Sequence, residues 1–131
     1  MGFSSDYQQT NEEVEKSLLG LMMIYGDELA EVIHEVSVED FYHDDHQIIF
    51  RAIRSLHDEG KPTNKVMLVE SLLKANMLTR IGGLDGIDRC TDRATTWVHA
   101  PLYATILRSY ATRRRSLDVV VRAFESFKNL D

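Results

Sequence analysis

Apolar residues recur at helical spacing along almost the whole chain, and this constrains the fold more than any other feature of the sequence. In the first such stretch, residues three or four positions apart fall on one helix face: Val14, Leu18, Leu21, Met22 and Tyr25. The alternation of apolar and polar residues that indicates a β-strand persists nowhere beyond a few residues. The sequence therefore predicts an all-α fold, a compact orthogonal bundle of about six helices ending in a long protruding helix.

Capping residues mark where several of these helices begin. Thr10 and Glu13 form a capping-box pair for the first helix, and Asn64 is suited to cap a helix from Val66 to Ala75. Further stripes at helical spacing predict core-facing residues: Leu29, Val32, Ile33 and Val36; Ile49, Phe50, Ile53 and Leu56; Leu68, Val69, Leu72 and Leu73; and Leu84, Ile87 and Cys90.

The last predicted helix begins near Pro101, a residue suited to a first helical turn, and extends to Lys128. At about 1.5 Å per residue it would be roughly 42 Å long. A globule of about 100 residues has a radius of gyration of only roughly 13 Å, so the helix should overshoot it. Its side chains follow a near-heptad rhythm: Tyr103, Leu107, Tyr110, Arg114, Leu117, Val121, Phe124 and Lys128.

The polar run at 112–116 interrupts this rhythm, and we interpret it as the edge of the globular part. The predicted organisation is a flexible N-terminus at 1–10, a helical domain at 11–112 and a protruding segment at 113–131. Leu117, Val121 and Phe124 share one face beyond the edge. Each such side chain is worth roughly 1.5–3 kcal/mol when fully buried, so we predict that another helix covers them in an oligomer interface.

The net charge of −6 hides an asymmetry along the chain. Residues 1–60 carry fourteen acidic and three basic side chains, a balance of −11, whereas residues 61–131 carry seven acidic and twelve basic ones, a balance of +5. An acidic half does not hold a DNA backbone, because that binding depends on cationic contacts and counterion release. The asymmetry instead favours matched protein partners, including copies of the chain itself, and at most weak, salt-labile DNA binding.

Several classes of protein are excluded by what the sequence lacks. Cys90 is the single cysteine, which excludes an internal disulfide and a cysteine-based zinc site. No apolar run approaches the roughly 18 residues that a membrane span needs. The N-terminus has neither the cationic nor the apolar part of a signal peptide, so a bacterial-type cytoplasmic location fits best.

One segment, Tyr42-His43-Asp44-Asp45-His46, carries metal-ligating residue types, and His57-Asp58 follows on the same predicted helix. His43 and His46 could share a helix face, and the His-Asp pairs resemble those of HD-type metal phosphohydrolases. We favour a structural interpretation, in which the carboxylates complement the helix N-terminus and His46 packs in the core. The sequence therefore predicts no metal site and no catalytic residue, with the HD-type hydrolase as a minor alternative.

The glycine-rich segment 82–86 does not fit a phosphate-binding loop, which needs a strand before it and a Lys-Ser/Thr pair behind it. Gly82 and Gly83 are instead predicted to supply positive φ angles at a break between helices. Trp97 could anchor a binding partner but is expected to pack onto the core. The run 113–115 of three arginines could grip phosphate but is expected to face solvent or acidic neighbours. Nothing here predicts a nucleotide site.

Five blocks of residues between Asn11 and Leu117 resemble, in their order, the N-terminal domain of DnaB-type replicative DNA helicases. The blocks are Asn11-Glu12-Glu13-Val14-Glu15-Lys16-Ser17-Leu18-Leu19-Gly20; Glu39-Asp40-Phe41-Tyr42 with His46, Ile49 and Phe50; Gly60-Lys61-Pro62 with Leu68, Glu70 and Leu72; Ile81-Gly82-Gly83; and Tyr103-Ala104 and Ile106-Leu107-Arg108 with Arg114. The chain departs from the family pattern at Gly86, where a bulky helix residue is usual.

The resemblance implies an all-α collar domain at 11–112 and the first helix of a helical hairpin at 113–131, truncated before a RecA-like motor that uses ATP and Mg²⁺. It implies self-association as a dimer, a hexamer built as a trimer of dimers in the parent, and docking of primase or a helicase loader. We expect no cofactor and no enzyme activity in this chain, whereas the parent would be an ATP-dependent 5′-to-3′ helicase of a bacterial or phage-infected cell. A stand-alone helical regulator that mimics the collar is the alternative.

Overall fold

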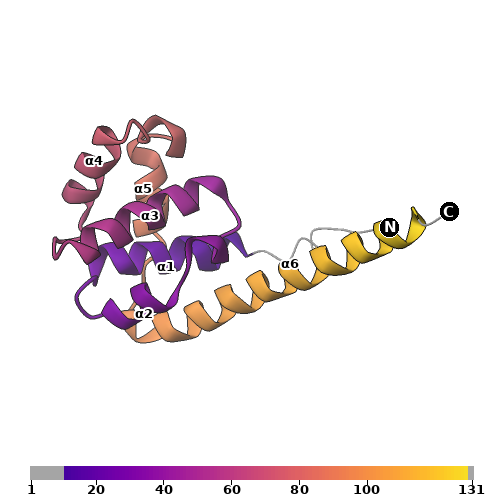
Figure 1. Cartoon of the computed structure of the whole chain (residues 1–131). Helices are drawn as coiled ribbons and strands as arrows, with labels where there is room; N and C mark the ends of the chain where they lie inside the picture. The colour runs from indigo at the N-terminus through magenta and orange to yellow at the C-terminus, as the bar shows by residue number, and fades with distance from the viewer. Residues whose placement is uncertain (1–10, 130–131) are drawn as a thin grey trace.

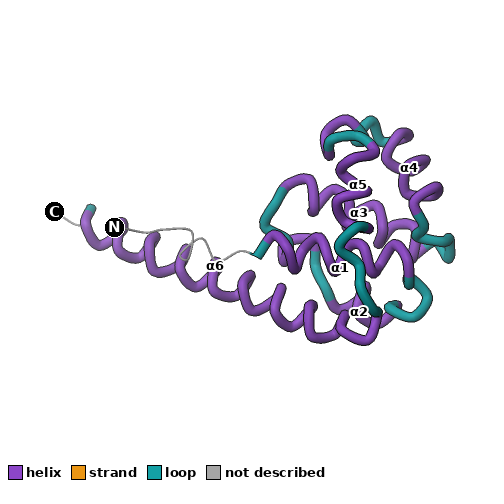
Figure 2. The backbone as a smooth tube through the Cα atoms, turned by 180° about the vertical axis from the view of Figure 1, so that it is seen from behind, coloured by secondary structure: helices purple, strands orange, loops and turns teal. Residues whose placement is uncertain are grey.

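The computed structural model describes residues 11–129, and within them every regular element is helical. The elements in chain order are α1 (Glu12–Ile24), α2 (Ala30–Glu35), η2 (Val38–Asp40), α3 (Asp44–Asp58), α4 (Lys65–Lys74), η3 (Thr79–Ile81), α5 (Leu84–Thr91), η4 (Trp97–His99) and α6 (Ala100–Lys128). Helices α1 to α5 gather at one end of the molecule, and α6 runs beneath them and then projects far beyond (Figures 1 and 2). The predicted all-α bundle with a long protruding helix is confirmed. The flexible segment predicted at 1–10 lies outside the described residues.

Helix α1 lies at the centre of the globular part, where it packs against α3, α5 and α6. Its side chains Leu18, Leu21 and Met22 are fully buried, as their spacing predicted. Gly20 also lies in this contact, because a Cβ at Gly20 would overlap the carbonyl oxygen of Cys90 in α5. The two helices therefore approach more closely than any larger residue would allow.

The helix starts are held by asparagine side chains. Asn11 Oδ1 accepts a hydrogen bond from Val14 N at 3.1 Å, so the N-cap of α1 is Asn11. The predicted capping residue Thr10 lies outside the described residues. Asn64 Oδ1 accepts from Met67 N at 3.0 Å, which confirms the predicted N-cap of α4.

Most of the predicted core-facing residues are buried, but two predictions are wrong. Leu73 and Leu84 are exposed. Helix α4 packs mainly against α3, so its core side is narrow and holds Leu68 and Leu72. Leu84 is the first residue of α5 and precedes the part of that helix which lies against α1.

The break before α5 uses glycines in unusual backbone conformations. Gly82 has a φ of 91°, and Gly83 has a φ of 68° with a ψ of −151°, a region that is essentially restricted to glycine. A Cβ at Gly86 would overlap the carbonyl oxygen of Ile81. At Gly86, where the chain departs from the family pattern, the first turn of α5 therefore packs directly against the end of η3.

The first part of α6 packs on the core through small side chains. Ala100, Ala104, Leu107 and Ala111 are buried, and they lie on one face of the helix, which packs against α1. The heptad rhythm predicted Tyr103 and Tyr110 on the core-facing line, and both are only partly buried. Alanine side chains are short, so the backbones of α6 and α1 can approach closely. The alanines therefore occupy the contact, and the larger tyrosines lie at its edge. Within the described residues, none after Ala111 is buried.

Candidate protein-interaction face

The projecting part of α6 carries exposed apolar side chains along one face. Leu117 is 46% exposed, Val121 44% and Phe124 62%, and their spacing places them on the same side of the helix. Val120 and Phe127 lie beside them and are also exposed. We call these five residues the distal face. Val120 and Phe127 were missed because the heptad rhythm counts only one residue per turn, although both are apolar and within one turn of the predicted positions.

The distal face does not continue the side of α6 that packs on the core. At about 3.6 residues per turn, Leu117 lies about 120° around the helix from Ala111. The positions that do continue the core-facing side are all charged: Arg115, Asp118, Arg122 and Glu125. Asp118 and Arg122 form an ion pair at 2.9 Å. The distal face thus lies to one side of the line of residues that packs on the core and does not continue it.

The arginine run contacts the globular part just beside the point where α6 leaves it. Arg115 Nη2 lies 3.0 Å from Asp40 Oδ1, and Arg114 Nη2 donates to the carbonyl oxygen of Asp40 at 3.0 Å. The Arg114 guanidinium also lies 5.4 Å from the centre of the Tyr42 ring. Burial lowers the pKa of Arg114, while the Glu15 and Asp40 carboxylates raise it, and the group stays charged at neutral pH. The predicted pairing with an acidic neighbour is confirmed for Arg115, whose partner is Asp40.

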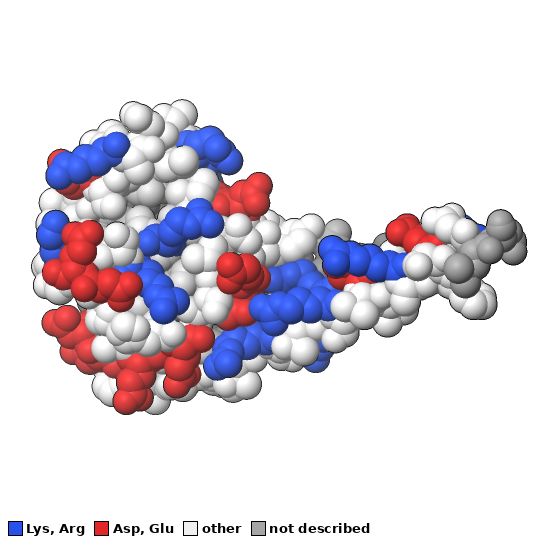
Figure 3. Space-filling view, viewed as in Figure 1, with Lys and Arg blue, Asp and Glu red and all other residues white. Residues whose placement is uncertain are grey.

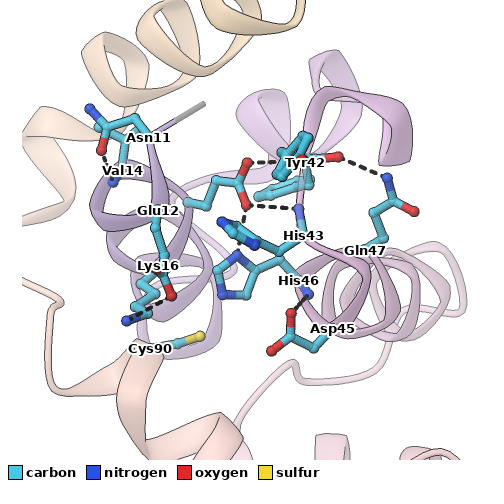
Figure 4. A network of polar contacts seen from close by, with 12 residues as sticks. Asn11, Glu12, Val14, Lys16, Tyr42, His43, Asp45, His46, Gln47 and Cys90 are labelled. Atoms are coloured by element: carbon cyan, nitrogen blue, oxygen red, sulfur yellow. Dashed lines mark hydrogen bonds and ion pairs between the residues drawn. The ribbon is translucent and has the colours of Figure 1, made fainter. Parts of the chain in front are cut away.

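The histidine-rich segment is built around a buried carboxylate that the sequence analysis did not single out. Glu15 of α1 is 1% exposed, and its Oε1 lies 2.7 Å from His46 Nδ1. Its two oxygens also accept backbone N–H groups, from Tyr42 at 2.6 Å and from His43 at 3.4 Å. Figure 4 shows Tyr42, His43 and His46 grouped around these contacts. His46 is buried, as expected of a core histidine.

The structure brings no metal-binding set together in the part of the chain that it describes. No group of three His, Cys, Asp or Glu side chains between residues 11 and 129 is arranged to hold a metal ion. The His43 ring packs against the His46 ring, with 5.2 Å between their centres, and its Nε2 is buried without a hydrogen-bond partner. His57 instead contacts His34 of α2. The segment therefore joins helices rather than forming a ligand cluster.

Two single residues differ in how well their surroundings could be predicted. Cys90 is buried, and burial raises the pKa of its thiol to about 12, so the thiol is protonated at neutral pH. Trp97 was expected to pack onto the core, but it lies in η4 with 43% of its surface exposed. The next residue after this turn, Ala100, is buried in place of Trp97.

Among the described helices, none has both the length and the apolarity that crossing a membrane requires.

Comparison with known proteins gives one consistent result. Residues 7–109 match the family described as the DnaB-like helicase N terminal domain. The chain is 34% identical over 108 residues to the replicative DNA helicase DnaB of Leifsonia xyli subsp. xyli (strain CTCB07), covering 82% of this chain and 24% of that protein. It is 31% identical over 111 residues to DnaB of Mycobacterium leprae (strain TN), covering 85% of this chain and 18% of that protein. The chain thus spans about a quarter or less of the length of these curated relatives.

A solved structure extends the similarity to three dimensions. The crystal structure of the N-terminal domain of DnaB helicase from Mycobacterium tuberculosis matches with a TM-score of 0.86 and 29% sequence identity, covering 90% of this chain and 86% of that one. The family match covers most of the chain and includes the helices α1 to α5 that form the globular part. The chain therefore belongs to the DnaB-like helicase N-terminal domain family.

Proposed function

We propose that this chain is the oligomerisation and partner-docking domain of a hexameric 5′-to-3′ replicative DNA helicase. Membership of the family supports this role, because its relatives are named replicative DNA helicases. In this proposal the domain supplies no catalytic residue, and a RecA-like motor elsewhere in the parent protein uses ATP and Mg²⁺. The site of action is the cytoplasm of a bacterial or phage-infected cell.

The observation that carries the proposal is the distal face of α6. Its five residues are apolar and exposed, and none of them continues the side of α6 that packs on the core. Burying a side chain of this kind contributes roughly 1.5–3 kcal/mol, so a covering helix would gain several such contributions. We assign this cover to a second copy of the chain, with 113–131 acting as the first helix of a hairpin. Three such dimers would form the collar of the parent hexamer.

The charge distribution supports docking of other proteins rather than direct DNA binding. Acidic side chains gather along the lower part of the globular end, basic ones are scattered over the rest of it, and a further basic group lies along α6 where it leaves that end (Figure 3). Glu31 and Glu35 of α2 contribute to the acidic side, and Arg108 of α6 lies 4.0 Å from Glu35. Separated surfaces of opposite sign favour oriented protein association. We propose primase and a helicase loader as the partners of this surface.

The proposal is tested by measuring the mass of the protein in solution, alone and with purified primase from the same replication system. Light scattering coupled to gel filtration should give a self-associated species alone and a heavier complex with primase. The alternative outcome is a monomer that does not bind primase. If that monomer binds an intact helicase hexamer and changes its unwinding rate, the chain is a stand-alone regulator.

A further inference from the structure

Arg114 and Arg115, at the start of the projecting part of α6, contact one short segment of the globular part, residues 39–42. Arg115 pairs with the Asp40 carboxylate, and Arg114 donates to the Asp40 carbonyl oxygen, both at 3.0 Å. The Tyr42 ring lies beneath the Arg114 guanidinium at 5.4 Å. Among the described residues, none of α6 after Arg115 forms a hydrogen bond or an ion pair with the globular part, so these contacts are the last of that kind along the projecting helix.

The same segment is held from its other side by Glu15. Helix α3 begins at Asp44, and its N-cap His43 makes no capping hydrogen bond with its own side chain. The Glu15 carboxylate instead accepts the N–H of His43 itself and of Tyr42 before it, while the His46 N–H in the first turn binds Asp45 Oδ1 at 3.1 Å. A negative charge is stabilised at a helix N-terminus, where unpaired N–H groups and the helix dipole both favour it. Glu15 of α1 thus holds the backbone that leads into the N-terminus of α3.

Tyr42 connects these two sets of contacts. Its backbone N–H binds Glu15, 2.6 Å away, while its ring packs under Arg114. Burial lowers the pKa of Arg114, and the Glu15 carboxylate opposes this by attracting the guanidinium. Asp40 completes the arrangement, since its Oδ2 accepts the Ser37 N–H at 2.9 Å while its Oδ1 holds Arg115.

We infer that Glu15 is a positioning residue that fixes the direction in which α6 projects, acting through Tyr42 and Asp40 on Arg114 and Arg115. The direction of α6 determines the position of the distal face relative to the globular part. The contacts of Glu15 and segment 39–42 therefore link the packing of α1 and α3 to that position. All of the contacts lie within one chain. The inference therefore stands whether or not the distal face self-associates.

The experiment measures the distance between the globular part and the end of α6. Spin labels are attached at Lys74→Cys in α4 and Ser126→Cys in α6, in a Cys90→Ala background. The labelled protein is diluted with unlabelled protein, so that pulsed electron paramagnetic resonance reports distances within one chain. The otherwise unchanged protein should give a narrow distance distribution. Glu15→Gln, and separately the double variant Arg114→Gln with Arg115→Gln, should broaden the distribution and shift its maximum.

Two control variants separate positioning from general stability. Arg113→Gln removes the same charge one position earlier, where the side chain lies over Tyr110 rather than Tyr42. Thr63→Val removes a buried hydrogen bond of 2.8 Å to the Met22 carbonyl oxygen, near the far end of α1. Both controls should leave the distance distribution narrow, although Thr63→Val lowers the stability of the fold.

Two results would overturn the inference: an unchanged distribution in the double arginine variant, or equal broadening in Thr63→Val and Glu15→Gln. If Glu15→Gln does not fold, Tyr42→Ala replaces it, because it removes the exposed ring and keeps the N–H that Glu15 binds. Broadening in Tyr42→Ala would support the inference, and a distribution as narrow as that of the Arg113→Gln control would contradict it.

Discussion

Gly20 of α1 packs directly against the carbonyl group of Cys90 in α5, with no space for a Cβ between them. Helices α1 and α5 form the most extensive helix pair in the globular part, and Cys90 is the last residue but one of α5. A glycine in the middle of a helix ordinarily costs about 1 kcal/mol relative to alanine, so local propensity alone favours replacing it. Its presence here is explained by the close approach of the two helices.

Gly20→Ala should therefore destabilise the fold, against the expectation from helix propensity. The added methyl group must push α1 and α5 apart, and overpacking of this kind typically costs about 1–3 kcal/mol. Urea unfolding followed by circular dichroism gives the change in the free energy of unfolding. Ser17→Ala, on the same helix, should be close to neutral. A more stable Gly20→Ala variant would show that the helices are not held at this distance.

Gly83→Val should lower the melting temperature because of backbone strain alone. The φ of 68° and ψ of −151° at Gly83 are costly for any residue with a Cβ, by about 1–3 kcal/mol and more for a β-branched one. A Cβ there would meet no neighbouring atom, so the loss would not come from a clash. Ser116→Val, on the exposed surface of α6, serves as the control in the same thermal scan. An unchanged melting temperature combined with lost partner binding would instead assign the loop to a ligand.

The stability of the protein should fall between about pH 9 and 12 in a way that depends on Cys90. The pKa of this thiol is raised from an ordinary value near 9.0 to about 12 by burial. In this range the folded chain keeps the proton and the unfolded chain loses it, so rising pH favours unfolding. Comparing the free energy of unfolding of the unchanged protein and Cys90→Ala across this range isolates the effect from other titrating groups. Parallel pH profiles would mean that the thiol ionises equally in both states.

The helices and most of the core could be predicted because their signals are local. An N-cap bonds to a backbone group three residues away, and an amphipathic stripe repeats every three or four residues. Leu68 and Leu72 were predicted from such a stripe, and so was Leu73, which is exposed. The stripe alone does not determine how many of its residues are buried. That number depends on how α3 packs against α4.

The buried Glu15 contact could not be predicted in this way. Its partners Tyr42, His43 and His46 are 27, 28 and 31 positions away in the sequence. Position 15 lies one turn before Leu18 and Leu19, on the core-facing side of α1, and that is the one local sign of burial. The core-facing side of α6 was also misplaced, because alanines give a weak hydrophobic signal and their role follows from the approach of α1.

The central claim is that the distal face of α6 associates with a second copy of the chain, and sedimentation equilibrium tests it most directly. The unchanged protein should sediment above its monomer mass of 15.0 kDa, and the triple variant Leu117→Ser, Val121→Asn and Phe124→Ser should sediment as a monomer with its globular part still folded. Val119→Ser, at an exposed position on the opposite side of α6, should leave the association intact. An unchanged protein that is already monomeric at high micromolar concentration, or a triple variant that unfolds, would contradict the claim.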